Sequence, residues 1–546
     1  MRIWQYVAAA LVVMFGSGLC STAYGQNVVN AVQDEPGDPD TTSPRRLQPE
    51  STVAIDQLNP DIIAGGAQDF RRTTELSEAC GGDRWNGLYL LSGAGVVLDN
   101  SLVPGYCTDP AMGAGTEQAI SEMFGLSTNT DPVIVFDRFD NLYYSHIAFN
   151  NDRKRTTPPS ASGVLYVSIY RDEGANTFEH AKTVKVPSGS GLRKAPHEVG
   201  PGNSNFDDKQ WMAVDNWPFS PFFGRVYVTW TKFGAQGGQS TIWISHCGGE
   251  GPSQQVCEDF SDGVVVNHPV AGGLVQESSP AVGPDGELYI AFLQFQGGFG
   301  STRPHSGIWI IKSTDGGETF TSQRLVTPIT QIPSPIPPAG AAANDGFNSF
   351  RTGTAPGVAV TADGTVHLVW GEWVNGANAE VRYARSLDGG ATWSTPISMS
   401  DVSTGHQFFP SIVADGNDVH VAWFDGRLNP AGETITDLQV FYNRSVNGSA
   451  FEPDIAVSED PFDPNQVSRF PVFCAAFIGD YIDIDAVDGR VAIIWSDNSN
   501  VVDPLSPEEC QDFRTRPADP DIQSRLDSGA LDQDAFVAID PSGPGT

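Results

Sequence analysis

One pattern of sequence recurs along almost the whole chain. Each copy is an apolar segment, a turn and a second apolar segment with an aromatic residue at its end, as in PAVGPDGELYIAF from Pro280 and PGVAVTADGTVHLVW from Pro356. Six copies begin at Pro132, Gln210, Pro280, Pro356, Pro410 and Asp480, and a weaker copy begins at Ser51. Their spacing averages about 70 residues, and a repeat of that length predicts an array of similar structural units.

A third strand is expected in every copy, after a loop of variable length. These strands are predicted at residues 87–92, 163–170, 241–246, 308–313, 381–386, 438–445 and 535–540, and in most units a weaker fourth strand follows. β-Branched and aromatic residues alternate, and Asp-Gly and Asn-Gly pairs separate the segments, which is typical of antiparallel hairpins. No long segment has helical periodicity. The pattern predicts an all-β fold, a β-propeller of four-stranded blades with seven blades favoured and six as the alternative.

Two turns after the predicted third strands share the pattern S-x-D-G-G-x-T-[FW]. They run from Ser313 to Phe320 and from Ser386 to Trp393, and a degenerate copy follows at residues 445–451. This pattern resembles the Asp-box, or BNR repeat, of sialidase-like propellers, and the resemblance spans roughly residues 50–540. We expect a structural role for its members, because an Asp closes the turn onto backbone N–H groups and glycine accepts a positive φ. The residues concerned are Ser313, Asp315, Gly317, Phe320, Ser386, Asp388, Gly390 and Trp393.

The beginning of the chain has the features of an export signal. Arg2 precedes an apolar stretch at residues 7–15, and Ala23-Tyr24-Gly25 offers a cleavage site of small residues. We therefore expect a signal peptide at residues 1–25, a flexible polar leader at 26–50 and a single propeller domain at 51–546. No later apolar run is long enough to span a bilayer. A secreted or periplasmic location is predicted.

Six cysteines remain after the expected signal peptide, and an even number in an exported chain predicts disulfides. Six cysteines allow 15 pairings. The blade pattern places two pairs beside each other at the same ends of neighbouring strands and one pair within a single turn. The predicted bridges are Cys80–Cys107, Cys247–Cys257 and Cys474–Cys510.

The charge of the chain restricts its partners. Acidic residues number 66 against 31 Lys and Arg, so the formal net charge is −35. A nucleic-acid partner is excluded, because binding phosphates requires clustered cations. No metal-binding motif is present, and we expect no cofactor; Asp480, Asp483 and Asp485 offer a weak alternative as a structural calcium site. A glycan or acidic polysaccharide is the expected partner of a monomeric chain.

Candidate binding residues lie on one predicted face. In a four-stranded meander, the turns between strands 1 and 2 and between strands 3 and 4 share one face, which we call the bottom face. The loops between strands 2 and 3 and the connections into strand 1 share the opposite face, the top face, and long loops on a rigid scaffold commonly carry binding sites. Arg351, Arg427 and Arg469 come from successive units and are predicted to bind a substrate carboxylate there, with Asp425 and His406 beside them.

The resemblance to sialidases implies further roles. Those enzymes use a Tyr nucleophile assisted by a Glu, with an Asp as acid/base. Tyr481 is the candidate nucleophile, Glu277 or Glu372 its partner, and Asp69 or Asp208 the acid.

Three functions compete. The first is a sialidase-like glycoside hydrolase that acts on acidic glycans. The second is a non-catalytic propeller that binds glycan or protein. The third is a polysaccharide lyase on uronate polymers, in which His406, Tyr481 and Arg469 would serve. A Tyr–Glu pair beside converging arginines favours the first, locally paired arginines the second, and a His–Tyr–Arg group without the Glu the third.

Overall fold

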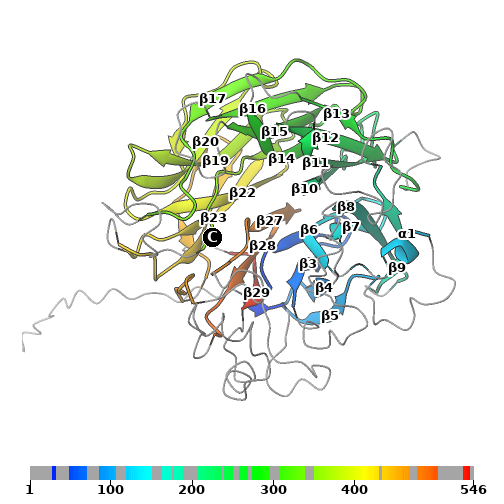
Figure 1. Ribbon diagram of the computed structural model, residues 1–546, viewed down its shortest axis with the longest axis horizontal. Coiled ribbons are helices and arrows are strands. Elements are labelled where there is room, and N and C mark those ends of the chain that lie inside the picture. The colour runs from blue at the N-terminus through cyan, green and yellow to red at the C-terminus, as the bar shows by residue number, and fades with distance from the viewer. Residues whose placement is uncertain are drawn as a thin grey trace, which may run out of the picture.

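Seven antiparallel sheets form the molecule, arranged as blades around a common axis (Figure 1). The prediction of a seven-bladed β-propeller is confirmed. The computed structural model describes residues 27–31, 48–70, 85–105, 118–123, 126, 128–149, 163–174, 177–187, 206–235, 239–249, 257–267, 273–295, 306–337, 350–429, 433–458, 460–466, 476–501 and 533–541. In each of blades 1 to 6 the first strand is innermost, and the strands follow one another outward in sequence order.

The first three blades are regular four-stranded meanders. Blade 1 comprises Thr52–Ile55 (β2), Ile62–Asp69 (β3), Trp85–Ser92 (β4) and Val97–Leu102 (β5). Blade 2 comprises Thr128–Phe136 (β6), Asn141–Phe149 (β7), Val164–Asp172 (β8) and Phe178–Lys185 (β9). Blade 3 comprises Phe206–Val214 (β10), Val226–Ala235 (β11), Gln239–Cys247 (β12) and Val264–Val265 (β13).

The next three blades repeat this order, and blade 6 has a fifth short strand that pairs with its third strand. Blade 4 comprises Leu274–Val282 (β14), Leu288–Phe295 (β15), Ser306–Ser313 (β16) and Arg324–Ile329 (β17). Blade 5 comprises Gly357–Val360 (β18), Val366–Val374 (β19), Asn378–Ser386 (β20) and Ile397–Ser398 (β21). Blade 6 comprises Gln407–Asp415 (β22), Asp418–Asp425 (β23), Gln439–Val446 (β24), Ala450–Phe451 (β25) and Ile455–Ala456 (β26).

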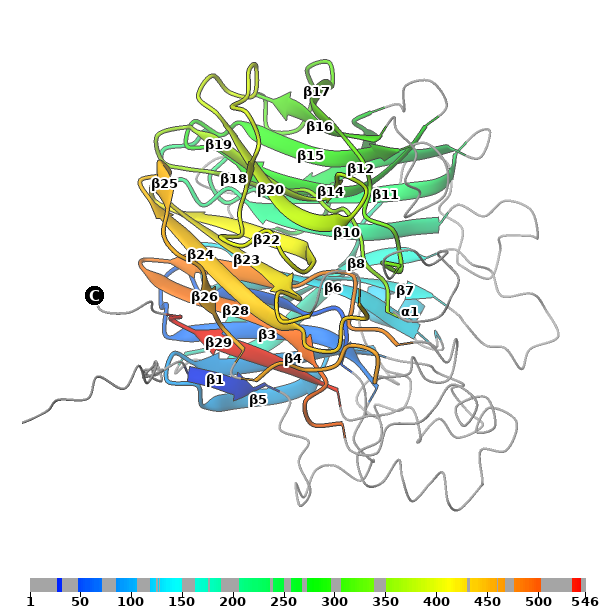
Figure 2. The same ribbon diagram turned by 90° about the vertical axis from the view of Figure 1, so that its left-hand side faces the viewer.

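Blade 7 joins the two ends of the chain. It comprises Asp483–Val487 (β27), Arg490–Asp497 (β28) and Asp534–Ile539 (β29), and its outermost strand is Asn27–Asn30 (β1) from the other end of the sequence. Asn27 pairs with Ile539 and Asn30 with Phe536, so β1 lies beside β29 (Figure 2). Residues 27–30, which the sequence placed in a flexible leader, therefore form a strand that closes the ring.

Helix is almost absent from this architecture. The described part of the chain contains one short helix, Gln118–Met123 (α1), which contacts β9. None of the helices in that part is both long and apolar enough to cross a bilayer.

Large aromatic side chains fill the spaces between neighbouring blades. Trp230, Trp370, Trp423 and Trp495 occupy the second strands of blades 3, 5, 6 and 7, and all four are fully buried. Each belongs to an apolar cluster that draws residues from two adjacent blades. The aromatic residue that recurs at the end of the sequence repeat is therefore core packing between the blades.

The two S-x-D-G-G-x-T-[FW] turns have the same hydrogen bonds. In the first, Thr319 N donates to Asp315 Oδ1 at 2.9 Å and Gly317 N to Ser313 Oγ at 2.9 Å; in the second, Thr392 N donates to Asp388 Oδ1 and Gly390 N to Ser386 Oγ, both at 2.8 Å. The glycine pairs have φ between 67° and 91°, which side chains rarely adopt. Phe320 packs against a cluster shared by blades 3 and 4, and Trp393 against one shared by blades 4 and 5.

One predicted disulfide is present in the described residues. Cys247 and Cys257 are bonded, with their Cα atoms 5.0 Å apart, and both side chains are buried against blades 2 and 3. The other two predicted bridges, Cys80–Cys107 and Cys474–Cys510, lie outside the described residues.

Candidate functional site

A β-bulge interrupts the innermost strand of several blades at the same place. The pairing register with the second strand shifts between Thr130 and Val133 in β6, and at the corresponding points of β10, β14 and β22. Two residues before pairing resumes, the backbone takes a positive φ at Asp131 (54°), Lys209 (50°), Glu277 (59°) and Phe409 (50°). Bulges of this kind redirect side chains, and positive φ at residues other than glycine is concentrated at functional sites.

The remaining blades carry a residue at the same offset. Glu50, Ala355 and Tyr481 lie two positions before the first paired residues of β2, β18 and β27, and Glu50 also has a positive φ, of 59°. In five of the seven blades the residue at this offset lies at the top end of the propeller axis. Five of the seven are polar, and the two exceptions, Ala355 and Phe409, belong to adjacent blades.

A pocket of about 620 Å³ opens at this end of the axis. We call it the axial pocket. Its charged lining consists of five carboxyl groups and two cations, and phenylalanines at the top ends of blades 2, 3 and 4 form part of its wall. The lining residues are Glu50, Thr130, Asp131, Phe149, Phe206, Asp208, Lys209, Phe233, Leu274, Gln276, Glu277, Phe295, Ser334, Arg351, Asp480 and Tyr481.

The pocket lies on the face opposite the glycine-rich turns. In blade 4, Leu274 of the pocket pairs with Phe295 at one end of the sheet, whereas Ser313 pairs with Leu288 and lies level with Val282 at the other end. The predicted division into a top face with charged residues and a bottom face with Asp-Gly-Gly turns agrees with this register.

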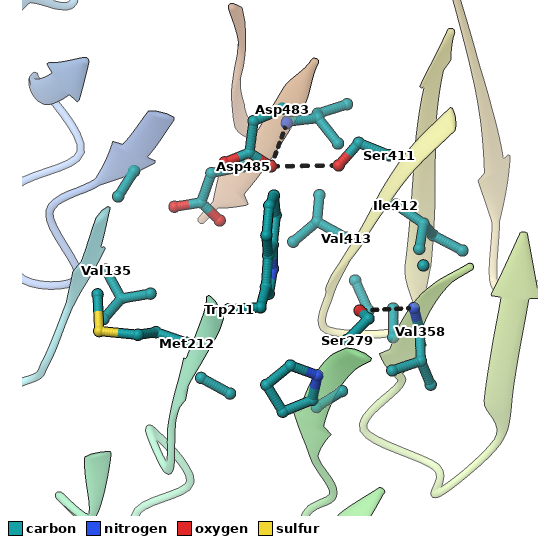
Figure 3. Close-up of a pocket in the computed structure, with 18 of the residues that line it drawn as sticks. Val135, Trp211, Met212, Ser279, Val358, Ser411, Ile412, Val413, Asp483 and Asp485 are labelled. Carbon is teal, nitrogen blue, oxygen red and sulfur yellow. Dashed lines mark hydrogen bonds between the residues drawn. The ribbon is translucent and has the colours of Figure 1, made fainter. Parts of the chain in front are cut away.

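A second cavity, of about 460 Å³, extends along the axis toward the bottom face. We call it the lower cavity. Innermost strands of all seven blades line it, and Trp211 projects into it between β10 and β27 (Figure 3). Lys209, Glu277 and Tyr481 line both cavities, so these three side chains lie at the level where the two cavities meet.

The ammonium group of Lys209 is held among aromatic rings and a carboxylate. Its Nζ lies 3.9 Å from the ring centre of Tyr481, 4.2 Å from that of Trp211 and 3.8 Å from Glu277 Oε2. Tyr481 and Trp211 are in edge-to-face contact, with ring centres 5.3 Å apart. Such stacking and pairing stabilises a buried ammonium, and it fixes Lys209 beside the carboxyl group of Glu277.

Two carboxyl groups of the axial pocket are prone to hold a proton. Burial raises the pKa of Glu277 to about 7; Lys209 opposes the shift, and the charges of Asp480 and Asp131 add to it. Burial likewise raises the pKa of Asp208 well above its ordinary value, and nearby Asp131, Glu277 and Asp480 raise it further. Like charges in a poorly solvated space disfavour ionisation, so the pocket combines neutral carboxyl groups with ionised ones.

Arg351 enters the axial pocket from the segment before blade 5. Its guanidinium group donates to Asp480 Oδ2, lies 3.9 Å from Glu50 Oε1 and stacks over Phe477 with Cζ 4.7 Å from the ring centre. Its side chain is 45% exposed. Arg351 and Asp480 are 129 positions apart in sequence, and their pairing fixes the Asp480 side chain in the pocket that Glu277 also lines.

Tyr481 is buried, with 6% of its surface exposed. Its hydroxyl group donates to the backbone oxygen of Pro132 at 3.1 Å, and burial raises its pKa well above the ordinary value. The face of the Tyr481 ring is therefore turned to Lys209, while its oxygen is bonded to blade 2.

The other candidates for substrate binding have local partners. Arg427 binds Asp425 at 2.8 Å, Asp454 at 2.7 Å and Asp401 at 2.9 Å, and its guanidinium group lies over Phe441. His406 stacks on Trp373 and accepts a hydrogen bond from Ala379 N, and burial lowers its pKa to about 4. Arg427, Asp425 and His406 are not among the residues that line the axial pocket.

Asp69, a candidate acid, and Glu372, a candidate partner of the Tyr nucleophile, also lie elsewhere. Asp69 accepts a hydrogen bond from the hydroxyl group of Tyr89 at 2.9 Å within blade 1, and Glu372 accepts one from the indole of Trp370 at 3.3 Å. Arg469 is outside the described residues. The structure thus brings Glu277, Arg351 and Tyr481 together, with Asp208 beside them.

The aspartates considered for calcium have hydrogen-bond donors as partners. Asp483 accepts from Thr52 Oγ1, Val53 N and Ser411 Oγ, and Asp485 accepts from Ile55 N. Within the described ranges, no group of three or more His, Cys, Asp or Glu side chains is arranged to hold a metal ion.

Glu50 and Asp131 are pocket residues that sequence reasoning missed. A usable signal exists, because both stand two positions before the first paired residue of an innermost strand, as Lys209, Glu277 and Tyr481 do. Aligning the repeats on their innermost strands would have shown the axial residue of these five blades.

The fold and the site define this protein as a seven-bladed β-propeller with a carboxylate-rich axial pocket. No protein-family model matches the chain, and no curated protein matches it. Solved structures that it resembles include a protein of unknown function from Dyadobacter fermentans, with a TM-score of 0.41 and 11% identity over 77% of this chain and 98% of that one. A Hadza microbial sialidase, Hz136, matches with a TM-score of 0.42 and 13% identity over 75% of this chain and 71% of that one. A polysaccharide lyase of family PL25, an ulvan lyase, matches with a TM-score of 0.43 and 10% identity over 83% of this chain and 92% of that one.

Proposed function

We propose that the protein is a glycoside hydrolase whose reaction takes place in the axial pocket. The observation that carries the proposal is Glu277, a buried carboxyl group with a pKa near 7 in a pocket that it shares with Asp480, the partner of Arg351. Hydrolysis of a glycosidic bond requires one carboxylic acid that protonates the leaving oxygen and one carboxylate that stabilises or attacks the sugar. Glu277 supplies the acid, and Asp480, oriented by Arg351, supplies the carboxylate.

The dimensions and the wall of the pocket suit a saccharide. About 620 Å³ is within the range of ligand sites, which run from roughly 300 to 1,000 Å³. Phe149 and Phe206 meet edge to face with ring centres 6.0 Å apart, and they provide apolar surface for the carbon face of a sugar ring. Polar groups opposite them would fix the hydroxyl groups.

A sialidase-type mechanism through Tyr481 is a finer version of the same proposal. It requires the Tyr481 hydroxyl to leave Pro132 and to lose its proton to a carboxylate, and Glu277 is one candidate because Lys209 contacts both side chains. An acidic sugar would also have to compete with Asp480 for Arg351. We therefore assign the acid role to Glu277 and leave Tyr481 as the support of Lys209.

Non-catalytic glycan binding is the second candidate, and a specific observation favours it. Arg351 and Arg427 are both paired with carboxylates of this chain. Paired arginines are what we expect of a propeller that binds glycan without catalysing a reaction. The lyase hypothesis, in which a Tyr or a His is the base, has less support: His406 is stacked on Trp373 away from the pocket lining, and the Tyr481 hydroxyl is bonded to Pro132.

The test is hydrolysis of a panel of fluorogenic glycosides that includes neutral sugars, amino sugars, uronides and a sialoside. We expect release of dye from at least one, and a loss of about 10²–10⁴-fold in kcat for Glu277→Gln. Asp285→Asn is the matched control, because Asp285 is an exposed carboxylate on the bottom face of the same blade. Dye release that survives Glu277→Gln would overturn the assignment, and binding without turnover of any glycoside would favour the second candidate.

A further inference from the structure

We propose that the axial pocket selects a sugar that carries an ammonium group, and that it discriminates against sugars that carry a carboxylate. This inference deepens the proposed function, and it rests on that function only in assigning a sugar to the pocket.

The balance of charge in the pocket is negative. Five carboxyl side chains line it, against Lys209 and Arg351. Both cations already face carboxylates, since Lys209 lies 3.8 Å from Glu277 and Arg351 is bonded to Asp480. A carboxylate on a ligand would have to displace one of these partners while facing the other acidic groups, and like charges at close range are costly in a poorly solvated site.

Asp131 and Asp208 have only neutral hydrogen-bond donors among the described residues. Thr130 Oγ1 donates to Asp131 at 2.6 Å, and Gln276 Nε2 donates to Asp208 at 3.3 Å. Both line the pocket, from the innermost strands of the adjacent blades 2 and 3. A ligand ammonium has three donors in a compact charge, so it would complete the bonding that the protein leaves unfinished.

A buried oxygen in the lining points to the same missing donor. Glu277 is 7% exposed, and its Oε2 has no hydrogen-bond donor, although Lys209 lies 3.8 Å away. Buried polar atoms in native proteins are nearly always hydrogen-bonded. An acceptor of this kind on the floor of an open pocket is explained by a donor that arrives with the ligand.

Protonation provides a signature that distinguishes the two kinds of ligand. Burial and mutual repulsion raise the pKa of Glu277 to about 7 and that of Asp208 well above its ordinary value. An ammonium group would lower both pKa values, so its binding near pH 6 would release protons from the protein. A carboxylate would raise them further, and its binding would take protons up.

The experiment is titration calorimetry of the full protein at pH 6 with three matched monosaccharides: glucosamine, glucose and glucuronic acid. Each titration is repeated in two buffers of different ionisation enthalpy, which yields the number of protons exchanged. We expect glucosamine to bind at least ten times more tightly than glucuronic acid and to release protons. Asp131→Asn and Asp208→Asn should each weaken glucosamine binding several-fold more than they weaken glucose binding, and Asp285→Asn should change neither.

Equal or tighter binding of glucuronic acid, or absence of glucosamine binding, would overturn the inference. Retention of the glucosamine preference in both Asp131→Asn and Asp208→Asn would also overturn it. A different outcome would contradict the proposed function. Glucosamine binding with proton release and no hydrolysis of any amino-sugar glycoside would sink the hydrolase proposal and leave this selectivity intact.

Discussion

Carboxylates at the two ends of the propeller experience opposite environments. On the bottom face, Asp388 accepts hydrogen bonds from the Thr392 side chain and backbone, and these lower its pKa to about 2. On the top face, burial and neighbouring carboxylates raise the pKa of Glu277 to about 7. The same chemical group is stabilised as an anion where donors surround it, and as an acid where other acids surround it.

This contrast separates scaffold from site. In the bottom turns, each aspartate accepts hydrogen bonds from residues of the same short segment. These turns therefore stabilise each blade locally. The axial pocket gathers its acidic groups from different blades and leaves them in mutual repulsion, which costs stability and is retained where chemistry needs it. Arg427 also satisfies its carboxylates, because three aspartates surround it, but two of these come from other segments of the chain.

The largest change in the free energy of unfolding is expected when buried carboxylates lose the arginine that they are paired with. Arg427→Met leaves the fully buried side chains of Asp425 and Asp454 without their ion-pair partner. Breaking a buried pair in this way should lower the free energy of unfolding by about 3 kcal/mol. Denaturant unfolding measures it, and hydrolysis at low temperature should be unaffected. A strong loss of activity with unchanged stability would instead place Arg427 in the site.

Glu277→Gln should raise the free energy of unfolding relative to wild type at neutral and alkaline pH, whereas Arg427→Met should lower it. A carboxyl group whose native pKa is raised stabilises the fold below the unfolded pKa, and that contribution is lost as pH rises through about 7. The glutamine variant does not undergo this loss. Relative to wild type, it should gain about 2 kcal/mol in unfolding free energy between pH 5 and pH 8. Parallel stability curves for the two proteins would show that Glu277 is ionised throughout, contrary to our account.

Asp315→Ala tests the bottom turns. Burial slightly opposes ionisation of Asp315, but hydrogen bonds from Thr319 and Ser313 outweigh it and lower its pKa to about 2. The substitution should reduce the unfolding free energy by about 1 kcal/mol at pH 7. The stability that Asp315 contributes depends on pH in the opposite way to that of Glu277. It is present above pH 4 and is lost as the pH falls through 2. Thermal unfolding at pH 7 and pH 2 provides the measurement, and an equal effect at both would contradict the mechanism.

The smallest effect concerns Lys209, whose charge lowers the pKa of Glu277. Lys209→Met should move the alkaline limb of the hydrolysis rate to higher pH, with a modest change in the maximum. A pH–rate profile of both proteins measures the displacement. Movement of the limb to lower pH would mean that another group controls it.

The sequence was sufficient for the repeating parts of this molecule and insufficient for contacts between distant segments. Strand periodicity and Asp-Gly turns repeat in every unit, so blade number and the two faces followed directly. Arg427 could not be placed, because its bond to Asp454 joins two loops separated by 27 positions. The bulges that aim Asp131 and Glu277 at the axis depend on pairing register, and the sequence indicates them only when the repeats are aligned on their innermost strands.

Strand β1 escaped prediction for a different reason. Asn27–Asn30 is only four residues long, and it has no copy elsewhere in the repeat. Its identity as a strand arises from β29, whose open edge supplies the backbone partners. Sequence patterns predict strands that recur, whereas β1 is a strand because it pairs with the edge of β29.

The closure of blade 7 by both chain ends imposes an order on assembly. Asn30 donates to Asp534, 504 positions later, so β1 finds its place only once β29 is available. The ring stays open until β1 has paired with β29. Contacts of such long range slow the final step of folding, and until that step the exposed edge of β29 is available to a β1 from another molecule.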